Sequence, residues 1–410
     1  MEKYTRDFVS EGHLIDSGIL TRILNLIVEE GAEYDILDFR MGKTNLETSH
    51  LELTVKCESG EKLESLTAQL VNLGCFEKTF KEAIIKRSPA DSCVPDDFYS
   101  TTNHRTLVYY DGKWHEVKNQ RMDGVIVIEK EGPVCKKLRE VKKDDRIVCT
   151  SQSVRLIPPF RDRESGEFGF MMNDVSSERS VEVAVDKIAE EFRRVKRNGG
   201  KIVAVAGPVV IHTGGGPALA TLIREGYIDG LLSGNALAVH DIESVLFGTS
   251  LGVDLKTGRP TYEGHRNHMR AINRVYHYGS IERTIQAGVI NSGVMYETIK
   301  RGIPFALAGS LRDDGPLPET ITDIVEAQEK YQEIIKGVSI VIMLSTMLHS
   351  IATGNMLPSW VRTICIDINP AVVTKLADRG SAQTIGIVTD VGLFLRSLAE
   401  KLTGIETEKI

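Results

Sequence analysis

The chain lacks any hydrophobic run that could cross a membrane. A membrane span needs about 20 consecutive apolar residues, whereas the longest apolar stretch, Val338–Leu344, has the length of a strand. It also lacks a basic surplus, since 50 Lys and Arg stand against 57 Asp and Glu and the net charge is -7. Nucleic-acid-binding proteins usually carry a basic stripe. We therefore expect no membrane and no nucleic-acid partner.

Cysteine pairs and a secretory signal are missing as well. The six cysteines form no C-x-x-C pair, and the first 16 residues carry acids without an apolar core segment. A chain of this length needs no disulfide framework. These absences predict reduced thiols and a cytoplasmic protein.

Several familiar catalytic signatures are absent. Neither G-x-G-x-x-G nor the P-loop pattern G-x-x-x-x-G-K-[ST] occurs. His265 and His268 lack the glutamate of H-E-x-x-H, so no metal site is predicted. The cysteines show no local nucleophile signature, and Cys365 falls inside a predicted buried strand. Catalysis by a covalent nucleophile is therefore not expected.

What is present is 410 residues, 41% hydrophobic and 26% charged, which suits two or three globular domains. Residues 1–95 show the order strand, helix, strand, strand, helix, strand, which predicts a ferredoxin-like α+β domain with Asp16 capping its first helix. Such domains bind regulatory amino acids or pair in dimers, and dimerisation or packing is favoured. A homo-oligomer is therefore expected. Residues 96–170 predict a small β domain and a linker, with a hairpin turn at Asp111-Gly112.

Residues 171–410 alternate between helical and strand-like patterns. A helix is expected to run from a cap at Ser176 or Ser177 to Arg197. This alternation predicts an α/β domain with a parallel sheet covered on both faces, whose ligands bind beyond the carboxyl ends of the strands. The predicted strands are 202–206, 229–232, 304–308, 338–344, 362–368 and 383–388.

One unit of this region, 201–243, points to a nucleotide. Its first strand is followed by Gly214, Gly215 and Gly216, then by a helical pattern over 217–225 and a strand-like run. A glycine-rich loop before a helix presents backbone N–H groups that can hold a pyrophosphate. A run of glycines is also common in flexible turns, so the motif alone leaves both interpretations open.

The predicted strand ends carry small and polar residues. Asp367 is the sharpest case, because an acid at a strand tip can accept hydrogen bonds from ribose hydroxyls. The alternative is an N-cap for the following helix, but Asn369 is the better cap. An acid disfavours a 2′-phosphate, so NAD is expected rather than NADP.

A basic segment, 262–274, is the second candidate. Its His265, Arg266, His268 and Arg270 lie within six residues. Arginine can clamp a carboxylate, and histidine can transfer protons near neutral pH. A solvated helix face explains the segment equally well. His212 is a site residue or a loop histidine, and His240-Asp241 is a site pair or the start of a helix.

Five segments together resemble a known family. They read GPVVIHTGGGPAL, LLSGNALAVHDIE, GHRNHMRAINR, AGSLRDDGPLPE and INPAVVTKLADRG. They are similar to the archaeal family related to lysine-ketoglutarate reductase/saccharopine dehydrogenase, which resembles the C-terminal part of cyanobacterial arginine-degrading bifunctional enzymes and includes an archaeal ornithine cyclodeaminase. The resemblance covers nearly the whole chain. It implies a deoxyhypusine-synthase-like domain with bound NAD that converts L-ornithine to L-proline and ammonia.

The resemblance also implies roles for individual residues. Arg266 would hold the substrate α-carboxylate, Asp313 its δ-ammonium, and His265 would shuttle protons. The residues implied to contact NAD are Gly214, Gly215, Gly216, Asn235, Ala236, Asp314, Thr346, Met347, Leu348, His349, Asp367, Asp390 and Val391.

Three alternatives stay open. A net amino-acid dehydrogenase of the saccharopine type would release NADH in proportion to substrate. An aminobutyl transferase would need a nucleophilic lysine, and the strand-end loops offer none. A sensor would bind NAD and an amino acid without turnover.

Overall fold

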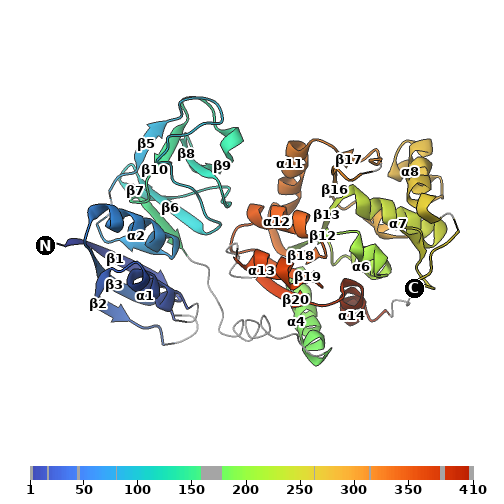
Figure 1. Cartoon of the computed structure of the whole chain (residues 1–410), viewed down its shortest axis with the longest axis horizontal. Coiled ribbons are helices and arrows are strands. Elements are labelled where there is room, and N and C mark those ends of the chain that lie inside the picture. The colour runs from blue at the N-terminus through green and yellow to red at the C-terminus, as the bar shows by residue number, and fades with distance from the viewer. Residues whose placement is uncertain are drawn as a thin grey trace. The chain divides into compact units, whose positions relative to one another are not determined.

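The computed structural model describes residues 3–15, 18–43, 47–79, 81–157, 178–262, 264–313, 315–378 and 384–405. The chain forms two compact units (Figure 1). One comprises the first 169 residues together with Asn355–Trp360, and the other comprises the remainder. No helix among the described residues is both long and apolar enough to span a membrane.

The chain begins with a four-stranded antiparallel sheet carrying two helices. The strand order β2-β3-β1-β4 is that of the split βαβ arrangement, which confirms the ferredoxin-like prediction. Ser59 caps the second helix by accepting the Lys62 N–H, whereas the predicted cap Asp16 lies outside the described residues. The elements are β1 (Tyr4–Gly12), α1 (Ile19–Glu29), β2 (Glu33–Arg40), β3 (Ser49–Cys57), α2 (Gly60–Asn72) and β4 (Cys75–Glu77).

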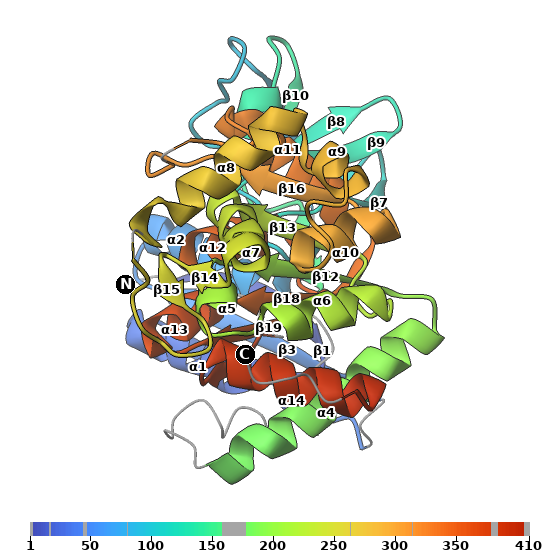
Figure 2. The same cartoon turned by 90° about the vertical axis from the view of Figure 1, so that its right-hand side faces the viewer.

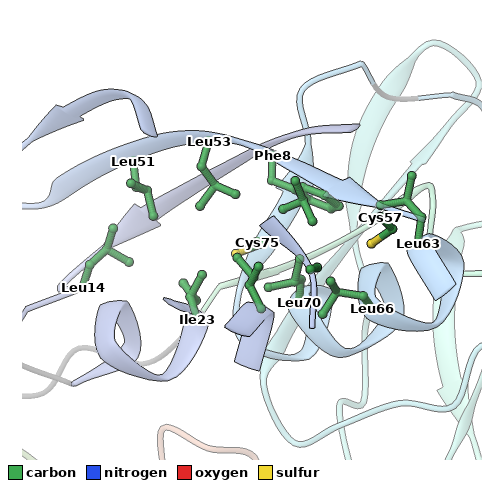
Figure 3. Close-up of a cluster of buried hydrophobic side chains, with 13 residues drawn as sticks. Phe8, Leu14, Ile23, Leu51, Leu53, Cys57, Leu63, Leu66, Leu70 and Cys75 are labelled. Atoms are coloured by element: carbon green, nitrogen blue, oxygen red, sulfur yellow. The ribbon is translucent and has the colours of Figure 1, made fainter. Parts of the chain in front are cut away.

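Alternation of residues along β3 explains this packing. Its odd-numbered side chains, among them Leu51 and Leu53, are buried, while the residues between them are half-buried. They meet Phe8 of β1, Ile23 of α1 and Leu70 of α2 in one cluster (Figure 3). The cluster closes the space between the sheet and its helices.

Two small antiparallel sheets follow, with the orders β5-β10-β8-β9 and β11-β6-β7. Asp111 and Gly112 have φ of 55° and 72°, the conformation of a type I′ turn, so the predicted hairpin is confirmed. Glu82 accepts both turn N–H groups, at 2.9 and 2.7 Å. The predicted linker lies outside the described residues beyond Ile157. The elements are β5 (Ile84–Arg87), β6 (Arg105–Tyr110), β7 (Lys113–Glu116), β8 (Val125–Glu129), β9 (Gly132–Lys136), η1 (Leu138–Glu140), β10 (Arg146–Cys149) and β11 (Val154–Ile157).

The second unit is built on a seven-stranded parallel sheet, counted over the described residues, with the order β17-β16-β13-β12-β18-β19-β20. All six predicted strands form, within one or two residues of the expected ends, and β17 adds an edge strand too short to show a pattern. The predicted α/β class is confirmed. The strands are β12 (Lys201–Ala206), β13 (Gly230–Gly234), β16 (Phe305–Ala308), β17 (Thr320–Ile321), β18 (Val338–Leu344), β19 (Arg362–Asp367) and β20 (Thr384–Val388).

Helices cover both faces of this sheet. The helices α11, α12 and α13 lie on one face, and α6, α7 and α14 lie on the other (Figure 1). The first helix, α4, packs along α14 (Figure 2), and Lys401 pairs with Asp186 at 2.6 Å. The predicted caps Ser176 and Ser177 lie outside the described residues. The helices are α4 (Glu178–Arg197), α5 (Val209–His212), α6 (Gly216–Arg224), α7 (Asn235–Phe247), α8 (Asn267–Tyr278), α9 (Ile281–Gln286), α10 (Val294–Arg301), α11 (Ile324–Ile335), α12 (Met347–Met356), α13 (Pro370–Asp378) and α14 (Val391–Thr403).

Candidate functional site

The order in which the chain adds strands to the sheet reverses between β12 and β18, although all the strands are parallel. From β12 the chain proceeds to β13 and β16 on one side, and from β18 to β19 and β20 on the other. Open α/β sheets bind ligands at such a switch point, beyond the carboxyl ends of the strands. The switch point therefore defines the candidate site.

Gly207 lets the two central strand ends approach each other closely. Its N–H donates to the Leu344 carbonyl at 3.0 Å. A Cβ at this position would lie 2.4 Å from the Ser345 carbonyl oxygen and 2.9 Å from Cβ of Thr346. Ser345 itself has a φ of 46°, in the left-handed region. Only glycine fits at position 207, and the sequence analysis did not single it out.

The glycine triplet does not directly follow β12, contrary to expectation. The one-turn helix α5 intervenes, since Pro208 has helical φ and Val210 and Ile211 are buried. The Gly214 and Gly215 N–H groups donate to the carbonyls of α5, and Gly215 lies against Gly392 at the start of α14. The triplet therefore forms the turn that connects α5 to α6. Its contact with a cofactor stays a prediction.

The start of α7 anchors the loop that follows β16. Asn235 is buried, and its Oδ1 accepts the Leu317 N–H at 3.0 Å and the Thr320 hydroxyl at 2.9 Å. Ala236 beside it is half-buried. Ser233 donates its hydroxyl to the Ala206 carbonyl at 2.5 Å, joining the ends of β12 and β13. Asn235 therefore fixes the geometry of the strand ends.

His349 reaches the end of β13 from the opposite face. The Tyr331 hydroxyl donates to the Ser233 carbonyl at 2.7 Å and lies 3.1 Å from Nδ1 of His349. Because this hydroxyl has one proton, Nδ1 is the donor to it, which leaves Nε2 as an acceptor. Burial lowers the pKa of His349, opposed by the charge of Asp313, so the imidazole is neutral at pH 7. A Cβ at Gly234 would lie 2.9 Å from that Nε2.

The acids at the strand ends also shape the local loops. Asp313 accepts the Ser310 N–H at 2.7 Å and its hydroxyl at 3.2 Å, closing a turn after β16. Asp390 caps α14 by accepting the Leu393 N–H at 2.8 Å, and Val391 beside it is buried. Asp314 lies outside the described residues.

Asp367, at the end of β19, is 8% exposed. Its Oδ1 accepts the Asn369 N–H at 2.8 Å. Asn369 in turn accepts the Ala371 N–H at 3.0 Å, so it is the helix cap that the sequence favoured. The second carboxylate oxygen of Asp367 is therefore the one available to a ligand.

Large apolar side chains are exposed at the same strand ends. Met347 and Leu348 begin α12, and Leu348 is 72% exposed. Leu311 after β16 and Ile368 after β19 are also exposed. A contiguous exposed apolar patch marks a binding surface, and Met347 and Leu348 are adjacent residues at the start of α12.

The basic segment lies across a short hairpin from α7. His265 and Arg266 belong to the 3-10 turn η4 (Gly264–Arg266), and both side chains are exposed. The hairpin consists of β14 (Thr249–Ser250) and β15 (Val253–Asp254). A Cβ at Gly252 would lie 2.4 Å from the Gly264 carbonyl carbon, so the turn and η4 are in tight backbone contact.

Three histidines from separate segments meet beside this hairpin. Nδ1 of His212, at the end of α5, is 2.6 Å from the Ser250 hydroxyl. The ring centroids of His212 and His240 are 4.8 Å apart, and those of His240 and His268 are 6.4 Å apart. Burial lowers the pKa of His212 to about 4, with the nearby His240 acting in the same direction. His212 is therefore neutral near pH 7.

Glu243 lies beneath His240 and is fully buried. Nδ1 of His240 is 2.8 Å from one carboxylate oxygen, and Thr249 and the Gly252 N–H donate to the other at 2.8 and 2.9 Å. Burial alone would raise the pKa of Glu243, but these hydrogen bonds hold it below its usual value. The carboxylate is therefore ionised at neutral pH.

His240 and Asp241 do not start a helix; that alternative is wrong. Both lie inside α7 and form different contacts. Asp241 accepts the N–H groups of Val294 and Met295 at 2.9 and 2.8 Å and thereby caps α10. Burial raises the pKa of Asp241 to about 6.

The pentapeptide Gly248–Gly252 has the G-x-S-x-G spacing of a nucleophile elbow. A nucleophile elbow places its serine on an exposed strand-to-helix turn. Here Ser250 is buried in a two-residue strand of a hairpin. The spacing therefore does not make an elbow.

Three family models match the chain. The region 186–398 matches "Arginine dihydrolase ArgZ-like, C-terminal, Rossmann fold", and 105–185 matches the first region of the same C-terminal part. Residues 6–104 match the "LOR/SDH bifunctional enzyme conserved region". The chain belongs to the ArgZ-like family.

The chain is similar to a protein of Methanocaldococcus jannaschii that is named ornithine cyclodeaminase. It is 50% identical over 99% of this chain and 98% of its own length. The apo crystal structure of ArgZ, a cyanobacterial arginine dihydrolase, matches 98% of this chain with 43% identity and a TM-score of 0.84. A ternary complex of AgrE with ornithine and NAD+ matches the same share with 45% identity and a TM-score of 0.54. This chain spans 58% of each of those two proteins.

The ArgZ-like chain thus gathers its predicted residues in two places. Among the described residues, Asp313, Asp367, Asp390 and the start of α12 each follow a strand at the carboxyl ends of the sheet, and the basic segment lies against the hairpin. Sequence analysis missed Gly207, Tyr331 and Glu243. His240 and Glu243 stand three residues apart on one helix, and that spacing is the signal that could have found the pair. No group of three or more His, Cys, Asp or Glu among the described residues is arranged to hold a metal ion.

Proposed function

We propose that this ArgZ-like protein is an NAD-dependent ornithine cyclodeaminase that converts L-ornithine to L-proline and ammonia. The observation that carries the proposal is the switch point closed by Gly207, on a chain 50% identical to an archaeal protein named ornithine cyclodeaminase. The AgrE complex with ornithine and NAD+ supports the same choice of ligands.

The residues at the switch point suit NAD. The close approach at Gly207 brings the ends of β12 and β18 together, and a pyrophosphate can lie beyond such strand ends at a switch point. The second oxygen of Asp367 suits a ribose hydroxyl, and its charge opposes a 2′-phosphate. The exposed Met347 and Leu348 can pack on a flat ring and exclude water.

When bound, NAD would supply reversible hydride exchange with the substrate α-carbon, so the overall reaction would need no external oxidant. The protein must then orient ornithine and move protons. Arg266 is assigned to the α-carboxylate, Asp313 to the δ-ammonium and His265 to proton transfer with solvent. The neutral His349, with Nε2 as an acceptor at the end of β13, orders the loop beside the cofactor.

A product assay tests this proposal. Purified protein is incubated with L-ornithine and catalytic NAD, and proline, ammonia and NADH are measured. Proline and ammonia in excess of total NAD are the expected result. Accumulation of NADH in proportion to an amino acid, without proline, would instead indicate a dehydrogenase. Tight NAD binding without turnover would indicate a sensor.

A further inference from the structure

We propose that His240, oriented by Glu243, is the general acid–base group of the cyclodeamination, in place of the exposed His265. The inference rests on the proposed function and deepens it. It follows from the buried side-chain cluster of His212, His240, Glu243 and Ser250 beside the hairpin that carries η4.

The Glu243 carboxylate fixes the protonation pattern of His240. It is fully buried and ionised, so it only accepts hydrogen bonds. Its partners besides His240 are the Thr249 hydroxyl and the N–H groups of Leu251 and Gly252. Nδ1 of His240 must therefore carry a proton, and Nε2 is the nitrogen that can gain or lose one. This carboxylate–imidazole arrangement is the one that orients a general base in hydrolase triads.

The cluster lies beside the segment that carries Arg266, the residue assigned to the substrate carboxylate. His212 ends α5, which follows β12, and His240 lies in the second turn of α7, which follows β13. The hairpin turn held by Glu243 contacts the backbone of η4, which carries Arg266. One buried carboxylate thus connects the acid–base group with the segment assigned to the substrate carboxylate.

The reaction needs a group that both takes and returns protons. The α-ammonium must lose a proton before its carbon is oxidised. The δ-ammonium must lose one before its nitrogen forms a bond to that carbon, and the departing α-nitrogen must gain protons to leave as ammonia. An imidazole beside a fixed carboxylate can serve each of these steps. The side chain of His265, by contrast, is exposed.

Among the described residues, the following charged or titratable groups face His240. Glu243 faces it from its own helix, His212 from α5 and His268 from α8, while Arg270 donates to Asn267 nearby. Both carboxylate oxygens of Asp241 accept backbone N–H groups at the start of α10. Glu243 is thus the negative charge that can stabilise a protonated His240, which makes it a positioning residue with a measurable electrostatic effect.

The test compares H240N, E243Q, H265N and the control H277N, an exposed histidine of α8. In H240N the amide takes the place of Nδ1–H, so Glu243 keeps its donor while Nε2, the atom proposed to exchange protons, is lost. For each variant the rate of proline formation is followed across pH, together with NAD affinity and the thermal midpoint. We expect H240N to lower kcat about 100-fold or more, the range of general acid–base catalysis, with NAD affinity unchanged.

E243Q should lower kcat less and shift the acidic limb of the pH–rate profile to lower pH, because the protonated imidazole loses its anion. A merely structural role would lower the thermal midpoint without moving that limb. If E243Q does not fold, H240N decides alone. H240N with wild-type kcat, or a large loss confined to H265N, would overturn the inference. Wild-type protein that makes no proline would instead refute the proposed function, and the inference with it.

Discussion

Asp367 allows cofactor selection to be tested at one oxygen atom. Its Oδ1 is occupied by the Asn369 N–H at 2.8 Å. Asp367→Asn keeps that acceptor but replaces the other oxygen and the charge. A hydrogen bond to a charged group contributes about 1.5–3 kcal/mol. We therefore expect the Kd for NAD to rise about 10- to 150-fold, while affinity for NADP changes less because a repulsive charge is removed.

Asp229 provides a matched control for this substitution. Its Oδ2 accepts the Ile202 N–H at 2.8 Å and its Oδ1 pairs with Lys196 at 2.6 Å. Asp229 lies at the amino ends of the strands, away from the candidate site. Asp229→Asn removes a similar charge, so it should affect stability but not NAD affinity. Titration calorimetry measures both Kd values. The ribose assignment is refuted if Asp367→Asn binds NAD as the wild type does, or if both variants lose affinity equally.

Three further substitutions probe other parts of the site. Gly207→Ala should abolish detectable NAD binding, because its Cβ would lie 2.4 Å from the Ser345 carbonyl oxygen; unchanged calorimetric binding would contradict this geometry. Arg266→Ala should raise KM for ornithine at least about tenfold, as loss of a charge-assisted hydrogen bond implies. Arg274→Ala, on the exposed side of α8, should leave KM unchanged, and equal effects would remove the assignment. His212 has a folded pKa of about 4 against an ordinary 6.5, so its unfolded form binds more protons between these values. Its contribution to the free energy of unfolding is therefore lost as pH falls from 6.5 to 4. Denaturant titrations should show that His212→Asn flattens this slope, and an unaltered slope would contradict the assignment.

The sheet was predictable because burial leaves a strong pattern. The residues from Ile202 to Ala206 are completely buried, as a strand covered on both faces requires. The edge strand Thr320–Ile321 and the single turn Val209–His212 were missed. Two and four residues are too few to show a period, and tertiary contacts decide their conformation.

The site was only partly predictable for a different reason. Strand-end residues such as Asp367 follow from topology, which brings the carboxyl ends of parallel strands to one edge. The cluster around His240 depends on how α5, α7 and the hairpin pack, and no spacing along the chain encodes the approach of His212. Gly207 was overlooked because its importance comes from Ser345, which belongs to a distant segment of the chain.

The pairing of β12 has a consequence for how the protein is made. This strand lies between β13 and β18, and Ala206 pairs with Leu344 only after the whole intervening chain has been synthesised. Pairing between such distant segments slows folding. Until β18 arrives, one edge of β12 is open to other strands, and the nascent chain is vulnerable to aggregation. The switch point is therefore also a late folding step, so substitutions there should affect expression yield as well as ligand binding.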